Sequence, residues 1–153
     1  MLFRSPEDAE QELVNLFRVN SNIVVVCDGD RARKDARVKD RVRRIRAEVR
    51  KIPGAYIWVT GAREIENYVP GAVLAKAMGL ASLPDPTRYE MFFPRKGAPD
   101  SSYVESKMKR KGIDKMDLAV LSAPYLNTPI MVTRFEWEQQ MKEIVERINA
   151  WNR

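Results

Sequence analysis

The sequence predicts an α/β domain with a mainly parallel sheet flanked by helices and a helical carboxyl-terminal part. Two short segments rich in β-branched and aromatic residues, 23–27 and 55–60, are typical of strands. A longer segment with apolar residues at helical spacing separates them, and a strand–helix–strand order indicates parallel pairing. The 153 residues match the size of one globular domain, so we expect a single unit over residues 1–153.

The composition excludes several catalytic chemistries. The chain has no histidine, which rules out Ser-His-Asp and Cys-His catalysis and a His-ligated zinc site. Catalysis would have to use carboxylates, lysine, tyrosine or a hard cation, and oxygen-ligated Mg²⁺ or Mn²⁺ is the cofactor we expect. The chain has 27 basic and 21 acidic residues, which gives a net charge of +6. This surplus favours a polyanionic partner such as nucleic acid.

The sequence also predicts a cytoplasmic protein that does not contact a membrane. No stretch approaches the roughly 20 apolar residues of a membrane helix, and the first residues include acids where a signal peptide would be basic. The single cysteine, Cys27, can form no internal disulfide.

The first half of the chain has clear signals for each element. Ser5 and Pro6 are typical of a helix start, and we expect this helix to continue to about Arg18. The apolar strand 23–27 predicts cover on both faces. Residues 33–52 have one apolar stripe and predict a helix that Pro53 ends. Because the strand at 55–60 follows, we expect a right-handed crossover that brings both strand ends to one edge, where α/β sites are usually built.

The second half is predicted to be mostly helical. We expect a helix from near Pro70 to Gly79, and then a loop or insertion at 82–99, which contains four prolines and has a short element around 89–93. Segments 101–111 and 114–122 also predict helices. Thr133 and Glu136 have the spacing of a capping box, and the helix they open has an apolar face that could pack internally or against a second copy in a homodimer.

Asp28 and Asp30 are the first candidates for chemistry. They follow the apolar strand directly and are separated by Gly29, which permits a tight turn, so both carboxylates could face one cation. The alternative is an ordinary strand-to-helix turn in which the two side chains cap backbone amides. The apolar strand in front of them favours the metal site.

Acids and a lysine elsewhere could complete such a site. Glu64 and Glu66 follow the second strand and could reach the same edge, or they could be solvated acids at a helix start. Lys115 could neutralise a phosphoryl transition state, although a lysine in a first helical turn is usually only exposed. The basic residues within 31–51 could follow a phosphate backbone, but Asp35, Asp40 and Glu48 interrupt them, as on a solvated helix face.

Several of these segments together resemble a known family. They are Ile23-Val24-Val25-Val26-Cys27-Asp28-Gly29-Asp30-Arg31, Trp58-Val59-Thr60 and Arg63-Glu64-Ile65-Glu66-Asn67-Tyr68. This pattern resembles the Toprim half of OLD-family (overcoming lysogenization defect) nucleases. Those proteins commonly join an ATPase domain to a carboxyl-terminal Toprim domain and are associated with DNA cleavage and phage defence. The likeness covers about residues 15–68, continues loosely through 107–119 and includes 148–152.

The resemblance implies a Toprim-like, Rossmann-like fold and roles for individual residues. Asp28 and Asp30 match the Toprim D-x-D metal ligands, Glu64 or Glu66 supplies a further acid, with Glu66 as the third metal ligand, and Lys115 matches a lysine near the scissile phosphate. Two-metal hydrolysis of a DNA phosphodiester would follow.

One part of the Toprim pattern is missing. Toprim domains open with a strand that ends in a glutamate, whereas this chain opens with a predicted helix in which Glu7, Glu10 and Glu12 match only by residue type. We therefore expect the carboxyl-terminal part of such a domain, without an ATPase P-loop motif. An ATPase domain or partner chain is then an expected partner.

The leading hypothesis is a Toprim-type, Mg²⁺- or Mn²⁺-dependent DNA endonuclease domain or fragment. The alternative is a non-catalytic nucleic-acid-binding or assembly module derived from a Toprim domain, which the missing glutamate favours. A phosphotransfer domain like the haloacid-dehalogenase-like phosphatases fits less well, because Ala32 stands where the D-x-D-x-T pattern has threonine.

Overall fold

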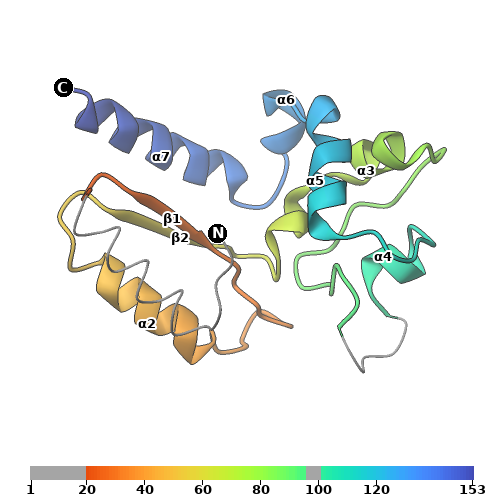
Figure 1. Cartoon of the computed structure of the whole chain (residues 1–153), viewed down its shortest axis with the longest axis horizontal. Coiled ribbons are helices and arrows are strands. Elements are labelled where there is room, and N and C mark those ends of the chain that lie inside the picture. Colours follow the sequence, from red (N-terminus) through yellow and green to blue (C-terminus); the bar gives the residue numbers. More distant parts are fainter. Residues whose placement is uncertain (1–19, 96–100) are drawn as a thin grey trace.

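The sheet consists of two short parallel strands. In the computed structural model, which describes residues 20–95 and 101–153, these are β1 (Val24–Cys27) and β2 (Tyr56–Val59) (Figure 1). Their register pairs Val24 with Tyr56 and Cys27 with Val59. The mixed α/β class, the parallel pairing and the shared strand-end edge are therefore confirmed.

Two helices lie on opposite sides of the strands. Figure 1 shows α2 (Asp40–Val49) on one side and α7 (Trp137–Trp151) on the other. Val42 and Val49 are the buried residues of α2. Trp137, Met141 and Ile144 of α7 pack against a buried cluster that contains Trp58 of β2. β2 thus packs against both helices.

Two expectations about this half of the chain are corrected. The helix expected over 33–52 forms only from Asp40 to Val49, because the chain before it turns back and brings Lys39 against Asp30. The strand β1 is not covered on both faces, and Val26 is 48 % exposed. The reason is that the described sheet has two strands, with the helices packed against β2.

The remaining elements form a helical region beside the sheet. They are η1 (Ile65–Tyr68), α3 (Gly71–Met78), α4 (Tyr103–Ser106), α5 (Lys115–Ser122), η2 (Ala123–Tyr125) and α6 (Thr128–Met131). The expected helices before Gly79 and after Asp114 are confirmed. Gly79 has a φ of 64° at the end of α3, and the Asp114 carboxylate caps α5 by accepting a hydrogen bond from the Asp117 amide.

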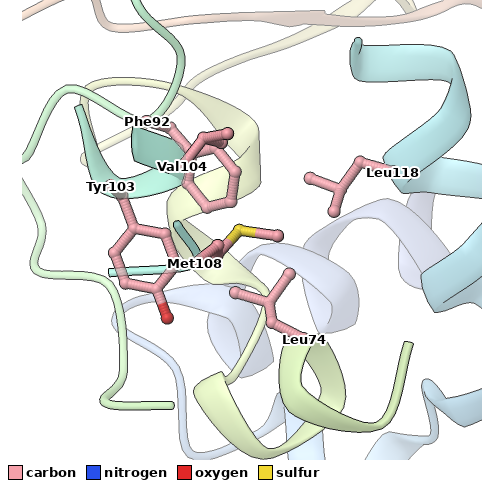
Figure 2. Close-up of a cluster of buried hydrophobic side chains, with 6 residues drawn as sticks. All are labelled: Leu74, Phe92, Tyr103, Val104, Met108 and Leu118. Atoms are coloured by element: carbon pink, nitrogen blue, oxygen red, sulfur yellow. The ribbon is translucent and has the colours of Figure 1, made fainter. Parts of the chain in front are cut away.

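A second apolar core holds this region together. Figure 2 shows Leu74 of α3 and Leu118 of α5 facing the side chains of Phe92, Tyr103, Val104 and Met108. The rings of Phe92 and Tyr103 are stacked with their centroids 5.1 Å apart. This core fixes the position of α5, and therefore of Lys115 at its first turn.

Three other expectations are wrong in detail. The segment 101–111 contains only the short helix α4, and Lys109 has a φ of 54°, which helical backbone does not adopt. No helix or strand forms at 89–93. Thr133 and Glu136 form no capping box: the Thr133 hydroxyl donates to the carbonyl of Ile130, and Glu136 binds groups outside its own helix.

The helix expected over residues 5–18, with Glu7, Glu10 and Glu12, lies outside the described residues. Within the described ranges, no helix has the length and apolar composition needed to cross a membrane.

Candidate functional site

The ends of β1 and β2 are locked together by a turn that requires glycine. The Gly29 amide donates to the Thr60 hydroxyl at 2.8 Å, and the Asp30 amide donates to the Arg63 carbonyl at 2.8 Å. A Cβ on Gly29 would lie 2.3 Å from the Thr60 carbonyl oxygen, so no larger residue fits without a backbone shift. This close approach brings the DGD turn against the segment that carries Glu64 and Glu66.

Asp28 has one carboxylate oxygen committed to the backbone and one directed toward other side chains. Oδ1 accepts a hydrogen bond from the Ile65 amide at 2.8 Å, at the start of η1. Oδ2 lies 3.8 Å from the Lys115 ammonium. The sequence left open whether Asp28 caps a backbone amide or belongs to a charged site. In the structure it does both.

Asp28, Glu64 and Glu66 converge on Lys115, and we call these four residues the acid–lysine cluster. Lys115 Nζ lies 3.6 Å from Glu64 Oε2 and 3.0 Å from Glu66 Oε1. The Phe93 ring centroid lies 5.6 Å from the same ammonium. Four of the five predicted site residues, from three separate segments of the chain, are thus brought together.

The cluster has more negative than positive charge and is partly removed from water. Burial raises the pKa of the Asp28 carboxyl, and the negative charge of Glu66 adds to this effect. Burial likewise raises the pKa of the Glu64 carboxyl, whose side chain is 8 % exposed. Burial alone would lower the pKa of Lys115, but the hydrogen bond and charge of Glu66 raise it overall. Three carboxylates thus share one ammonium.

Asp30 lies outside the cluster. Its carboxylate pairs with Lys39 at 2.7 Å and with Arg95 at 2.9 Å. Burial would raise the pKa of this carboxyl, but the hydrogen bond from Lys39 and the charge of Arg95 lower it overall. Asp30 also has a φ of 54°, a conformation that Asp and Asn tolerate better than most residues. The structure therefore separates the two aspartates of the D-x-D pair.

Another carboxylate, which the sequence did not single out for this role, lies next to the end of β2. Glu136 accepts hydrogen bonds from the Gly61 amide and the Tyr68 hydroxyl and pairs with Arg88 at 2.8 Å. We call this group the Glu136 clamp. Burial would raise the pKa of Glu136, but its hydrogen bond from Tyr68 and its other donors lower it overall. No local signal could have found the clamp, because its members come from three separate segments of the chain.

The donor chemistry of the acid–lysine cluster suits a hard cation. Carboxylate oxygens are the ligands that Mg²⁺ and Mn²⁺ prefer. Within the described part of the chain, no three Asp, Glu or Cys side chains are already arranged around a common metal position. The three carboxylates instead surround an ammonium whose side chain is 52 % exposed, so a metal ion would take the place of that ammonium.

Comparisons of the chain with protein-family models, curated proteins and solved structures found no significant match. The Toprim resemblance thus stays a prediction that rests on the motifs themselves.

Proposed function

We propose that this chain is a divalent-metal-dependent phosphodiesterase domain of the Toprim type that acts on DNA. The observation that carries the proposal is the convergence of three carboxylates on the ammonium of Lys115, at the edge where both parallel strands end. These carboxylates belong to Asp28, Glu64 and Glu66. In the structure the cation that they share is this ammonium, and carboxylate oxygens are also the ligands that Mg²⁺ and Mn²⁺ prefer. These three residues would hold the ion.

The residues of the cluster have distinct roles under this proposal. A bound divalent ion supplies an activated water and charge stabilisation at the leaving oxygen. Glu64, which has a raised pKa, would take up a proton from the attacking water. Lys115 would move from the carboxylates to a phosphate oxygen and neutralise the charge that develops there. Its half-exposed side chain leaves it free to do so.

The position of Asp30 bears on how many ions the site holds. The two-metal mechanism that the resemblance implies uses both aspartates of the DGD turn. In this structure the Asp30 carboxylate is bound to Lys39 and Arg95. It would have to leave both partners to contribute to a second ion.

DNA as the substrate is supported by basic side chains next to the site and along α2. Lys39 and Arg95 reach Asp30 directly beside the cluster. The interrupting acids are partly neutralised, since Asp40 pairs with Arg43 and Glu48 with Lys51. The remaining basic residues of this helix could contact phosphates.

A non-catalytic, nucleic-acid-binding or assembly module is the second candidate. It is favoured by the ammonium of Lys115, which already compensates part of the cluster's charge, and by the ion pairs that occupy Asp30. In this case the cluster would stabilise the strand-end turn and the basic surface would bind DNA without cleavage. An ATPase domain or partner chain belongs with either candidate as a further expected partner.

Cleavage of supercoiled plasmid by the purified chain distinguishes the two. Wild type would be incubated with Mg²⁺ or Mn²⁺, with EDTA, and beside Asp28→Ala, Asp30→Ala and the matched control Glu136→Gln. We expect metal-dependent nicking that Asp28→Ala abolishes and Glu136→Gln retains. Absence of nicking by wild type, with plasmid binding retained, would support the non-catalytic module.

A further inference from the structure

The outer edge of β2 lies at the base of a slot between α2 and α7. The slot has a volume of about 470 Å³, and all four residues of β2 line it together with residues of both helices. No residue of β1 or of the acid–lysine cluster is part of its lining. Its walls are formed by lining residues of α2 and α7, and Figure 1 shows these two helices on opposite sides of the strands. It is separate from the proposed metal site.

Backbone groups of β2 point into this slot. The amides of Tyr56 and Thr60 donate to Ile23 and Cys27 on the β1 side, at 2.8 and 2.9 Å. Because successive amides of a strand alternate in direction, those of Ile57 and Val59 point away from β1. No other described strand pairs with β2. The slot therefore holds an open strand edge with donors and acceptors at the spacing of another strand.

We propose that this slot binds an extended, acidic polypeptide segment of a partner protein as a third strand beside β2. Strand addition to an open sheet edge uses the partner's main-chain groups for affinity and the flanking side chains for specificity. A two-stranded sheet gains most from such an addition, because sheets are rarely stable with so few strands.

The charge of the walls argues for an acidic segment. Arg46 of α2 and Arg50, which directly follows this helix, are exposed and line the slot, with Arg147 of α7 on the other side. Arg147 pairs with Glu143, and its guanidinium lies 4.6 Å from the ring centroid of Tyr56. The lining acid Glu136 is already bound by Gly61, Tyr68 and Arg88. The slot thus retains positive charge that an acidic side chain would balance.

The same features argue against two other occupants. A second copy of this chain would bring its own Arg46 and Arg50 to the paired edges, and like charges placed opposite each other are unfavourable. A nucleic acid could bind the arginines but has no amide backbone to match the Ile57 and Val59 amides. A polypeptide strand satisfies both the edge and the charge.

Amide hydrogen exchange measured by NMR on the full chain tests the proposal. The probe is a capped six-residue peptide of alternating Glu and Val, compared with the same peptide carrying Lys in place of Glu. We expect the acidic peptide to slow exchange of the Ile57 and Val59 amides by at least about tenfold, the mark of new hydrogen bonds at this edge. The Lys peptide should leave both amides unchanged.

Two charge-reversal variants provide the matched comparison. Arg50→Glu should remove the protection, whereas Arg43→Glu, the same change on α2 outside the slot lining, should retain it. Ile57→Pro removes an amide that β1 does not use and should also abolish binding. Absence of protection at millimolar acidic peptide, or equal protection by the Lys peptide, would overturn the proposal. So would protection by a DNA duplex in place of the peptide, or protection that rises with protein concentration alone.

Discussion

The acid–lysine cluster and the Glu136 clamp both lie just beyond β2 and contain buried or half-buried carboxylates, three in the cluster and one in the clamp, but their charges are balanced differently. In the clamp, one carboxylate is bound by Arg88, a hydroxyl and a backbone amide, and its pKa is lowered. In the cluster, three carboxylates share one half-exposed lysine, and the pKa values of Asp28 and Glu64 are raised. The clamp is electrostatically satisfied, whereas the cluster is not.

This difference separates a structural ion pair from a candidate site. A satisfied carboxylate contributes to stability and gains nothing from a further cation. Carboxylates held together by the fold with too little positive charge cost stability, and they regain it when a cation binds. The comparison therefore predicts that changes in the clamp affect folding, whereas changes in the cluster affect metal binding and catalysis.

The largest expected effect is on cleavage by the Glu64→Gln variant. Loss of the buried carboxylate removes a metal ligand and proton acceptor, so plasmid nicking should fall by about 100-fold or more. Asp30→Asn, which only disturbs the ion pairs with Lys39 and Arg95, should reduce nicking far less. An equal loss of nicking in the two variants would show that Asp30 matters as much for cleavage as the cluster does.

For the free energy of unfolding, we expect a larger effect from a change in the clamp than from a change in the cluster. Glu136→Gln removes the ion pair with Arg88 and weakens two other hydrogen bonds, so the free energy of unfolding should fall by about 2 kcal/mol in urea titrations. Glu64→Gln at the same pH should be neutral or stabilising, because it removes a charge that burial disfavours and relieves the repulsion from Glu66 and Asp28, which together outweigh the lost attraction to Lys115. A Glu64→Gln variant that is destabilised as much as Glu136→Gln would show that the cluster is a satisfied structural network.

Removing the lysine should expose the repulsion within the cluster. Lys115→Met should lower the free energy of unfolding by about 1 kcal/mol, a modest value because the side chain is half exposed. Mg²⁺ should restore the stability of this variant and raise it more than that of wild type, since no ammonium competes for the carboxylates. Lys142→Met, which breaks an exposed pair with Glu138, serves as the control that Mg²⁺ should not rescue.

The smallest effect is expected in the pH dependence of unfolding. The pKa of Glu136 is lowered in the folded protein, so its stabilisation is present above its ordinary pKa of 4.5 and is lost as the pH falls through the folded-state value. The pKa of Glu64 is raised, so its contribution becomes more favourable as the pH falls toward 4.5. Between about pH 6 and 3, Glu136→Gln should therefore lose stability less steeply than wild type and Glu64→Gln more steeply, by less than about 1 kcal/mol each. Parallel curves for both variants would contradict the pKa assignments.

Local patterns predicted the parallel strands and the approach of Glu64 and Glu66 to the end of β1, whereas Lys115 was singled out only by the family resemblance. The strand ends and the motif around Glu64 are encoded within short segments, and parallel pairing by itself brings them to one edge. Asp30 was not predictable in the same way, because Lys39 and Arg95, which hold it away, come from the start of α2 and from a distant loop. Glu136 had the spacing of a capping box, yet the tertiary contacts with Gly61 and Tyr68 take its carboxylate. In both cases, tertiary contacts set the position of the carboxylate.

The most direct test is a calorimetric titration of Mn²⁺ into wild type, Asp28→Asn and Glu136→Gln. If the acid–lysine cluster is a metal site, wild type and Glu136→Gln will bind Mn²⁺ with similar affinity, and Asp28→Asn will lose at least about tenfold. If Asp28→Asn binds as well as wild type, or if none of the three proteins binds Mn²⁺, the cluster is not the metal site.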